Sequence, residues 1–344
     1  MIAIESNNHF MADVSLKSAS VLTACGVAMV AIAAGLSHPV NAQTARYPVR
    51  PVRLIVPLAP AGSTDIVARI VAQKLSEGLG QSTIVDNRPG AGTTLGTALV
   101  AKATPDGYTL LFTSASLATN AVLYSKLPFD TIKDFAPIAA VGQSFYVLIV
   151  QPSLGVASVQ ELITMAKAKP NHVQYASAGQ GTITHLAAEL FMMNAQIKMQ
   201  DVPFKGGAPA LVAFLSGQLP VIFSPIAECL PHLRGGAKIR ALAVTNAKRS
   251  TDLPDLPTLA EVGVPGSEVV SKSGVYAPAG TPSAIVERLN TEINRMLQVA
   301  EVRDRLRSHG LTPVGGTPAE LSNYIKSEIA RWTKVVKTAG IKIN

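Results

Sequence analysis

The clearest pattern of apolar and polar positions lies near the start of the chain, between residues 52 and 80. An apolar, β-branched run over 52–56 predicts a buried strand, because such runs fill parallel strands that are covered on both faces. From Ile66 to Leu79 apolar residues recur at helical spacing, which predicts an amphipathic helix. The residues between, 57–65, supply prolines, a glycine and side chains that cap helices. We therefore expect a helix that begins at the carboxyl end of a strand.

The same alternation of strand and helix continues along the chain. Further strands are expected at 83–85, 108–113, 135–150, 173–175, 221–224, 239–245 and 275–278, and further helices near 96–103, 158–169, 183–193, 210–215, 281–297 and 317–336. Strands that alternate with helices are typical of a parallel, doubly wound α/β sheet.

The length of the chain favours two domains. Without the first 42 residues about 300 remain, which is more than one hydrophobic core usually holds. The long apolar segment at 135–150 predicts a crossing from one domain to the other, and the strand near 270–276 predicts the return. We expect one domain from residues 43–146 plus 270–344 and a second from residues 147–269.

Residues 1–42 have the pattern of a secretory signal peptide. Lys17 is followed by an uncharged, apolar and small-residue run over 18–36, and small residues at 40–42 predict cleavage after Ala42. We therefore expect export to the periplasm. A competing pattern ends at Cys25 and resembles a lipoprotein signal, but it falls inside the apolar run, which disfavours lipid attachment.

The charge and the cysteine content of the chain indicate which kinds of ligand and partner to expect. The formal net charge of +8 suits an anionic ligand or a membrane surface. Lys and Arg are scattered, without a basic run interleaved with aromatics, so a nucleic-acid partner is not expected. After residue 42 only Cys229 remains, which excludes an internal disulfide, and no apolar stretch is long enough to span a bilayer. Clustered His and Cys and the glycine fingerprints of nucleotide sites are missing, so no metal or cofactor is expected.

Two loops between a strand and a helix, 57–65 and 176–183, predict an anion site. The first N–H groups of a helix have no partner within it, and the helix dipole adds about half a positive charge there. A third loop at 205–209 precedes another helix. The plainer alternative is that every α/β protein has such loops; two of them, more than a hundred residues apart, favour one ligand that bridges them.

Eight segments, in this order, resemble the substrate-binding proteins of the tripartite tricarboxylate transporters, the Bug receptors, over residues 46–344. They are YPVRPVRLIVPLAPAGSTDIVARIVAQKL, VDNRPGAGTTLG, ATPDGYTLLF, YASAGQGTITHLAAELF, VPFKGGAPALVAFLSGQ, IRALAVT, LPTLAEVG and GVYAPAGTP. The resemblance implies a periplasmic binding protein of type II fold, in which two doubly wound α/β domains hold a small carboxylate in the cleft between them and deliver it to permease subunits in the membrane. We expect a monomer.

In this family, loops matching 60–65 and 177–182 hold the carboxylate through backbone N–H groups and bridging waters. The chain departs from the family pattern in four places. Family sequences often have a double glycine at Ala61 and Gly62, an Asp at Pro220, an Asp or Gly at Ser224 and an aromatic near 271–273. The missing aromatic removes a wall of the cleft, so the ligand of a relative does not transfer directly.

The predicted ligand-binding residues lie in these loops and at strand ends that carry small polar side chains. They are Ala61, Gly62, Ser63, Thr64, Asp65, Ser114, Ser116, Asn120, Ser177, Ala178, Gly179, Gly181, Thr182, His185, Lys205, Gly206 and Ser224. Three of them have alternative roles: Asp65 caps its helix or holds a ligand amine, His185 donates to the anion or ties its loop down, and Lys205 binds the anion or points to solvent.

Two other functions were weighed from the sequence. A hydrolase that uses Ser177 as nucleophile and His185 as base is disfavoured, because no GxSxG elbow and no acidic residue that orients His185 are recognisable. A ligand sensor that presents its closed form to a signalling receptor is compatible with the same fold, and the sequence does not separate it from a transport receptor.

Overall fold

The computed structural model describes residues 47–60, 62–204, 206–236 and 238–341, and for Ser63 the backbone alone. The chain separates into two compact units, Met1–Tyr47 and Pro48–Asn344. Of the first unit only Tyr47 is described, so the predicted signal peptide, its cleavage site and Cys25 lie outside the described residues. Ala61 and Lys205 lie outside them as well.

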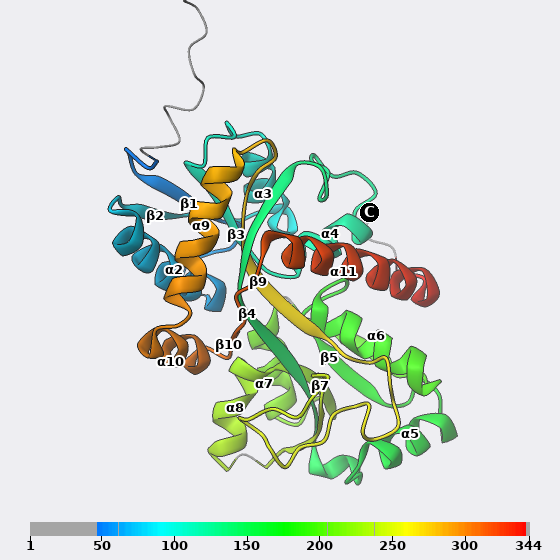
Figure 1. Cartoon of the computed structure of the whole chain (residues 1–344). Helices are drawn as coiled ribbons and strands as arrows, with labels where there is room; N and C mark the ends of the chain where they lie inside the picture. Colours follow the sequence, from blue (N-terminus) through cyan, green and yellow to red (C-terminus); the bar gives the residue numbers. More distant parts are fainter. Residues whose placement is uncertain (1–46, 61, 205, 237, 342–344) are drawn as a thin grey trace, which may run out of the picture. The chain divides into compact units, whose positions relative to one another are not determined.

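The second unit is a mixed α/β structure (Figure 1). Its strands are β1 (Val52–Val56), β2 (Thr83–Asn87), β3 (Thr109–Thr113), β4 (Phe135–Val150), β5 (Gln174–Ser177), β6 (Gln200–Pro203), β7 (Val221–Pro225), β8 (Arg240–Val244), β9 (Val270–Pro278) and β10 (Thr312–Pro313). Its helices, with two short 3-10 turns written η, are α2 (Ser63–Leu79), η3 (Ala91–Thr93), α3 (Thr94–Ala101), α4 (Ser116–Leu123), η4 (Pro152–Leu154), α5 (Val159–Ala168), α6 (Ile183–Ala195), α7 (Gly207–Leu215), α8 (Ile226–Arg234), α9 (Ser283–Met296), α10 (Ala300–Ser308) and α11 (Pro318–Ala339).

The strands form a sheet with two parallel sets joined by antiparallel strands. In the first set β1 pairs in parallel with β2 and β3, and in the second β5 pairs in parallel with β6 and β7. The predicted parallel pairing is confirmed within each set. Between them β9 pairs antiparallel with β3, β4 pairs antiparallel with β9, and β7 pairs antiparallel with β4, so the sheet as a whole is mixed. The antiparallel pairing depends on contacts between residues far apart in the sequence, and local sequence patterns do not predict such contacts.

The carboxyl ends of the two sets face each other along β4. Thr113, at the end of β3, pairs with Gly274 of β9, which in turn pairs with Ala140 of β4. From the other direction Pro225, at the end of β7, pairs with Tyr146 of β4. The three successive antiparallel pairings make β7 run opposite to β3. Helices that follow the two sets of strands therefore start on facing edges, on either side of the middle of β4.

Helices cover both faces of the second set of strands. Leu148 and Val150 of β4 pack into a core beneath α5, α6 and α11, whereas Val147 and Ile149 pack into a separate core beneath α7 and α8. This follows from the strand period, because successive side chains point to opposite faces of a sheet. The doubly wound arrangement that the sequence predicts is therefore present.

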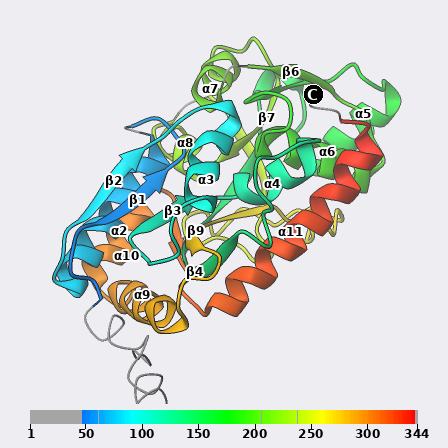
Figure 2. The same ribbon diagram turned by 90° about the horizontal axis from the view of Figure 1, so that it is seen from above.

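The last helix, α11, packs on cores from both sets of strands. Its first half places Leu321 and Ile325 in a core with side chains of β1, β3 and α4. Its second half places Trp332, which is fully buried, in the core beneath α6. Figure 2 shows α11 running past α4 and α6, both of which it contacts. A capping box at its start joins Thr317 and Glu320, as the sequence pattern predicts.

Candidate functional site

A hollow of about 430 Å³ lies where the facing helix starts meet. We call it the main hollow. Its lining residues are Gly92, Thr93, Ser114, Ala115, Ser116, Thr119, Asn120, Leu123, Tyr124, Tyr146, Ala178, Gln180, Gly181, Thr182, Ile183, Thr184, Gly207, Pro225, Glu228 and Ser271. They come from the starts of α4, α6, α7 and α8, from η3, and from β4 and β9. The hollow is thus built by loops of both sets of strands.

None of the four helices α4, α6, α7 and α8 is capped by a side chain within the described residues. In α6 the N–H groups of Ile183 and Thr184 have no acceptor there, and both residues line the main hollow. Among the described α-helices, side chains cap only α5, through Ser158, and α11, through Thr317. In α4 the N–H groups of Leu117 and Ala118 already bond to the carbonyls of Ser114 and Ala115. Free N–H groups of α6 and the positive ends of all four helix dipoles therefore meet at the main hollow.

The loop before α6 holds itself in shape with its own side chains. Thr184 Oγ1 accepts the N–H of Ala178 at 2.9 Å, and His185 Nδ1 accepts the N–H of Gly181 at 3.1 Å. Thr182 donates its hydroxyl to the carbonyl of Gly179 at 2.6 Å, and its own N–H also bonds to that carbonyl, at 3.2 Å. The free N–H donors of this loop, within the described part of the chain, are therefore at Gln180, Ile183 and Thr184, whereas the N–H groups of Ala178, Gly181 and Thr182 have acceptors within the loop.

Gly179 adopts a backbone conformation that this loop requires. Its φ is +120°, a value that side-chain-bearing residues rarely adopt, and a Cβ there would lie 3.1 Å from the carbonyl oxygen of Phe204. The close approach of residues 179 and 204 also sets the spacing between the starts of α6 and α7, since Gly206 donates its N–H to the carbonyl of Ala178 at 3.1 Å.

His185 faces away from the main hollow toward two acidic residues. Its Nε2 lies 3.6 Å from Glu189 Oε1 and 3.8 Å from Asp201 Oδ2. Because Nδ1 accepts a bond from Gly181, the imidazole proton sits on Nε2 and points at these carboxylates. Burial lowers the pKa of His185, and the charge of Asp201 opposes this shift. Burial also raises the pKa of Glu189. His185 thus ties the loop down, the second of the two roles considered for it.

The opposite wall is held by the loop before α4. The side-chain amide of Asn120 donates to the carbonyl of Gly92 at 2.8 Å and to Thr93 Oγ1 at 2.9 Å. Thr93 has a φ of +80°, which is uncommon for a residue with a side chain. Ser116 and Thr113 share a hydrogen bond between their hydroxyls, at 3.1 Å. Asn120 therefore orders this wall, and Thr93 was not recognised from the sequence because nothing local marks its conformation.

Two smaller hollows adjoin the main one. The side hollow, about 130 Å³, is lined by Thr64 at the start of α2 and shares Ser114 and Glu228 with the main hollow. The inner hollow, about 10 Å³, is lined by Ser224 and also by Glu228. Helix α2, which follows the first predicted loop, therefore reaches the side hollow through Thr64.

The structure sorts the predicted site residues into three groups. Those that line one of the three hollows are Thr64, Ser114, Ser116, Asn120, Ala178, Gly181, Thr182 and Ser224. Those that line none of the three hollows are Gly62, Asp65, Ser177, Gly179, His185 and Gly206. Ala61, Lys205 and the side chain of Ser63 lie outside the described residues.

Asp65 and Ser177 have structural partners. Asp65 is buried and its Oδ2 accepts a bond from Arg69 Nε at 3.0 Å, one turn further along α2. Ser177 is fully buried, and its Oγ accepts the N–H of Gly179 at 3.3 Å. Within the described residues no hydrogen bond joins Ser177 to His185, so the arrangement of nucleophile and base that a hydrolase needs is not formed.

Sequence reasoning missed Glu228, which lines all three hollows. It lies in the first turn of α8, directly after β7. Like the predicted loops, this segment joins the carboxyl end of a strand to the start of a helix. The segment was not recognised because it has no glycine loop: β7 ends at Pro225 and α8 begins at Ile226.

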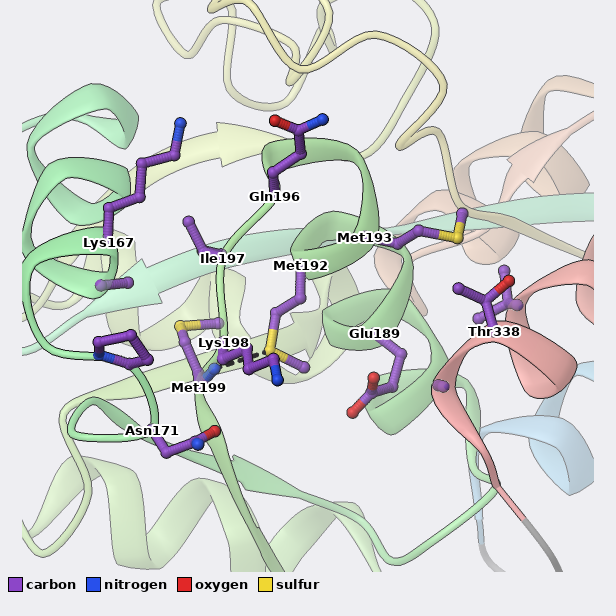
Figure 3. A pocket seen from close by; sticks show the side chains of 14 residues that line it. Lys167, Asn171, Glu189, Met192, Met193, Gln196, Ile197, Lys198, Met199 and Thr338 are labelled. Atoms are coloured by element: carbon purple, nitrogen blue, oxygen red, sulfur yellow. Dashed lines mark hydrogen bonds between the residues drawn. The ribbon is translucent and has the colours of Figure 1, made fainter.

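A larger hollow of about 780 Å³ lies elsewhere, between α5, α6 and α11 (Figure 3). Lys167, Gln196 and Thr338, which line it, belong to the carboxyl ends of these three helices. Lys167 and Lys198 bring positive charge to this hollow and Glu189 brings negative charge, but the helix ends that line it are carboxyl ends, which present C=O groups and not N–H donors. The main hollow, with its helix starts, is the better candidate despite its smaller volume.

Within the described residues, no group of three or more His, Cys, Asp or Glu side chains is placed to hold a metal ion. A search of the same part of the chain for a helix with the length and apolar character of a membrane span finds none.

Comparison with known proteins gives a consistent family. The model of the family described as "Tripartite tricarboxylate transporter family receptor" matches residues 67–341. Protein BugT of Bordetella pertussis is 39% identical, over 90% of this chain and 95% of BugT. The structure of R. palustris Rpa4515 with adipate is 40% identical, with a TM-score of 0.76 over 86% of this chain and 99% of that one. MatC from Rhodopseudomonas palustris, with bound malate, is 33% identical, with a TM-score of 0.72 over 84% and 100%.

The environment of His185 predicts a pH dependence of stability. Its folded-state pKa is lowered, so between that value and the ordinary value near 6.5 the unfolded chain binds more protons. Stability from this residue is therefore complete above about pH 6.5 and is lost as the pH falls. The loss approaches about 1.4 kcal/mol for each unit by which the two pKa values differ.

The test compares free energies of unfolding from urea titrations at about pH 7.5 and pH 5.5. His185→Asn keeps an acceptor for the Gly181 N–H but does not titrate, so it should lose less stability over this range than the wild type. His172→Asn, at an exposed position, is the matched control and should keep the wild-type dependence. Equal losses in wild type and His185→Asn would contradict the prediction.

Proposed function

The chain belongs to the tripartite tricarboxylate transporter receptor family, and we propose that it captures a small dicarboxylate in the periplasm and delivers it to the membrane subunits of such a transporter. The family consists of binding proteins and not of enzymes, and the fold is the mixed α/β fold of periplasmic binding proteins. The proposal includes export through a signal peptide over residues 1–42 and action as a monomer.

One observation carries the proposal: the starts of α4, α6, α7 and α8 open into a single hollow. Such donors give directional bonds and partial positive charge to a carboxylate. They do so without burying a formal positive charge, which would be costly to desolvate when no ligand is present. No Lys or Arg stands among the described residues that line the main hollow. The main hollow therefore has the chemistry of an anion-binding site that is built from backbone N–H groups.

The size and two-sided build of the site support a ligand with two carboxylates. The volume of about 430 Å³ lies within the range of small-molecule sites, about 300 to 1,000 Å³. Donors come from α4 on one side and from α6, α7 and α8 on the other. Two relatives are described with the dicarboxylates adipate and malate. We propose that the two carboxylates of one ligand engage the two sides.

The proposal divides the mature chain into lobes of residues 43–146 plus 270–344 and residues 147–269, joined where β4 and β9 cross. The loops that line the main hollow come from both lobes. A ligand that bonds to both sides favours the arrangement that brings them together. We expect the lobes to close on the ligand by a hinge movement at these crossings.

Closure predicts that saturating dicarboxylate lowers the radius of gyration in small-angle X-ray scattering. Acetate at the same concentration is the control, since a single carboxylate does not reach both sides. A ligand that binds by calorimetry and leaves the scattering curve unchanged would count against closure at β4 and β9.

A thermal-shift panel tests the ligand class. At a ligand concentration of about 100 times the dissociation constant, binding adds about 2.7 kcal/mol, which at about 2 °C per kcal/mol raises the melting temperature by about 5 °C. The panel contains acetate, succinate, glutarate, adipate and malate, with glucose and choline as ligands that lack a carboxylate. We expect shifts from dicarboxylates alone. Shifts from glucose or choline without any from the carboxylates would overturn the proposed function.

Gly179→Val tests whether the backbone of the second loop carries binding. The φ of +120° imposes strain on a valine, and its Cβ meets the carbonyl of Phe204, so the loop must move. We expect the affinity for the best ligand of the panel to fall at least about tenfold, or about 1.4 kcal/mol. Gly155→Val, also at positive φ but in open space away from the site, controls for strain alone and should keep its affinity. Undiminished affinity in Gly179→Val, measured by calorimetry, would rule out this loop as a ligand clamp.

A further inference from the structure

Glu228 is the one acidic residue among the described lining of the main hollow. It lies in the first turn of α8, and both of its carboxylate oxygens are near the start of α7, where a Cβ on Gly207 would lie 3.0 Å from each. The same residue lines the side and inner hollows. Its carboxyl group therefore stands at the point where the three hollows meet.

No described side chain forms an ion pair with this carboxyl group, and the positive charge beside it is the partial charge at the starts of α7 and α8. Glu228 forms no ion pair or hydrogen bond with any residue in the described part of the chain. The titratable groups around it are Tyr146 of β4, Cys229 next to it in α8, and His309, which follows α10 and lines the side hollow. Lys205, which precedes α7 in the sequence, lies outside the described residues.

Burial raises the pKa of Glu228, so this side chain takes up a proton more readily than an exposed glutamate. A dicarboxylate in the main hollow adds negative charge beside it. Like charges at short range in a partly dry site disfavour each other's ionised form, which makes a proton on Glu228 still more favourable when ligand is bound. A protonated carboxyl group also gains an O–H donor, which a carboxylate ligand accepts.

We propose that Glu228 is a specificity-determining residue that donates its O–H to a ligand carboxylate, so that the receptor takes up a proton from solvent with each dicarboxylate it binds. The inference rests on the proposed function, because it needs an anionic ligand in the main hollow. Linkage gives the sign: proton uptake on binding makes the affinity rise as the pH falls. The site then holds dicarboxylates more tightly in acidic surroundings.

Isothermal titration calorimetry of the full mature protein tests this, with the tightest-binding dicarboxylate of the thermal panel as the probe. Titrations at about pH 8 and pH 6 give the affinity. Parallel titrations at about pH 8 in HEPES and in Tris, whose ionisation enthalpies differ, count the protons taken up. The wild type should bind at least about tenfold more tightly at the lower pH and take up close to one proton.

Glu228→Gln supplies a neutral side chain that donates at every pH. It should bind as tightly at pH 8 as the wild type does at pH 6, and it should take up no proton. Glu301→Gln removes an exposed acid on α10 and is the matched control, which should behave as the wild type does. The buffer comparison on the wild type keeps the inference testable even when Glu228→Gln folds poorly.

Three results would overturn the inference. Weaker binding by Glu228→Gln at both pH values would mean that an ionised Glu228 accepts a bond from a ligand hydroxyl or ammonium. A pH-dependent affinity that persists in Glu228→Gln, or the lack of proton uptake by the wild type, would show that Glu228 does not take up a proton when the ligand binds. In each case dicarboxylate binding, and so the proposed function, would stand. If no dicarboxylate binds in the thermal panel, both fall together.

Discussion

The N–H groups in the first turn of an α-helix have no acceptor inside the helix, and a protein must find one for them elsewhere. This chain solves the problem in two ways. Ser158 and Thr317 cap α5 and α11 with their side chains. Four other helices, α4, α6, α7 and α8, start beside the main hollow without a side-chain cap in the described structure, and in α4 the backbone itself accepts two of the N–H groups. The architecture of the sheet is what brings these four starts together.

The strand directions explain that convergence. In each parallel set the helices start at the carboxyl ends of the strands, as the topology of such sheets requires. The antiparallel strands β9 and β4 reverse the second set relative to the first, so the carboxyl ends face each other. A single parallel sheet would have placed all the helix starts along one edge, where a small ligand reaches only neighbouring loops. The mixed sheet allows one ligand to touch both.

Much of this could be predicted from the sequence, and the failures have physical causes. The strand over 52–56 and the helix to Leu79 follow from the spacing of apolar residues and from the prolines and glycine between the two elements. The capping box at Thr317 follows from the local pattern of capping residues. The antiparallel pairing of β4 with β9 spans more than a hundred residues and its pairing with β7 more than about seventy, and local patterns do not encode contacts over such separations. The loop of Ala178 was found, but the use of its N–H groups was not, because side-chain acceptors such as Thr184 become visible only in three dimensions.

The donors at the main hollow belong to the backbone, and this affects how the site tolerates substitution. A change of side chain at Ile183 or Thr184 does not delete the N–H of that residue, unless the new residue is proline. Most point mutations at these positions therefore leave the N–H donors that bind a negative charge in place. Lining side chains that do not hold the loops in shape, such as Ile183, remain free to vary, and with them the length and shape of the anion accepted. One scaffold can in this way diversify its ligands over evolutionary time while the means of holding the charge stays constant.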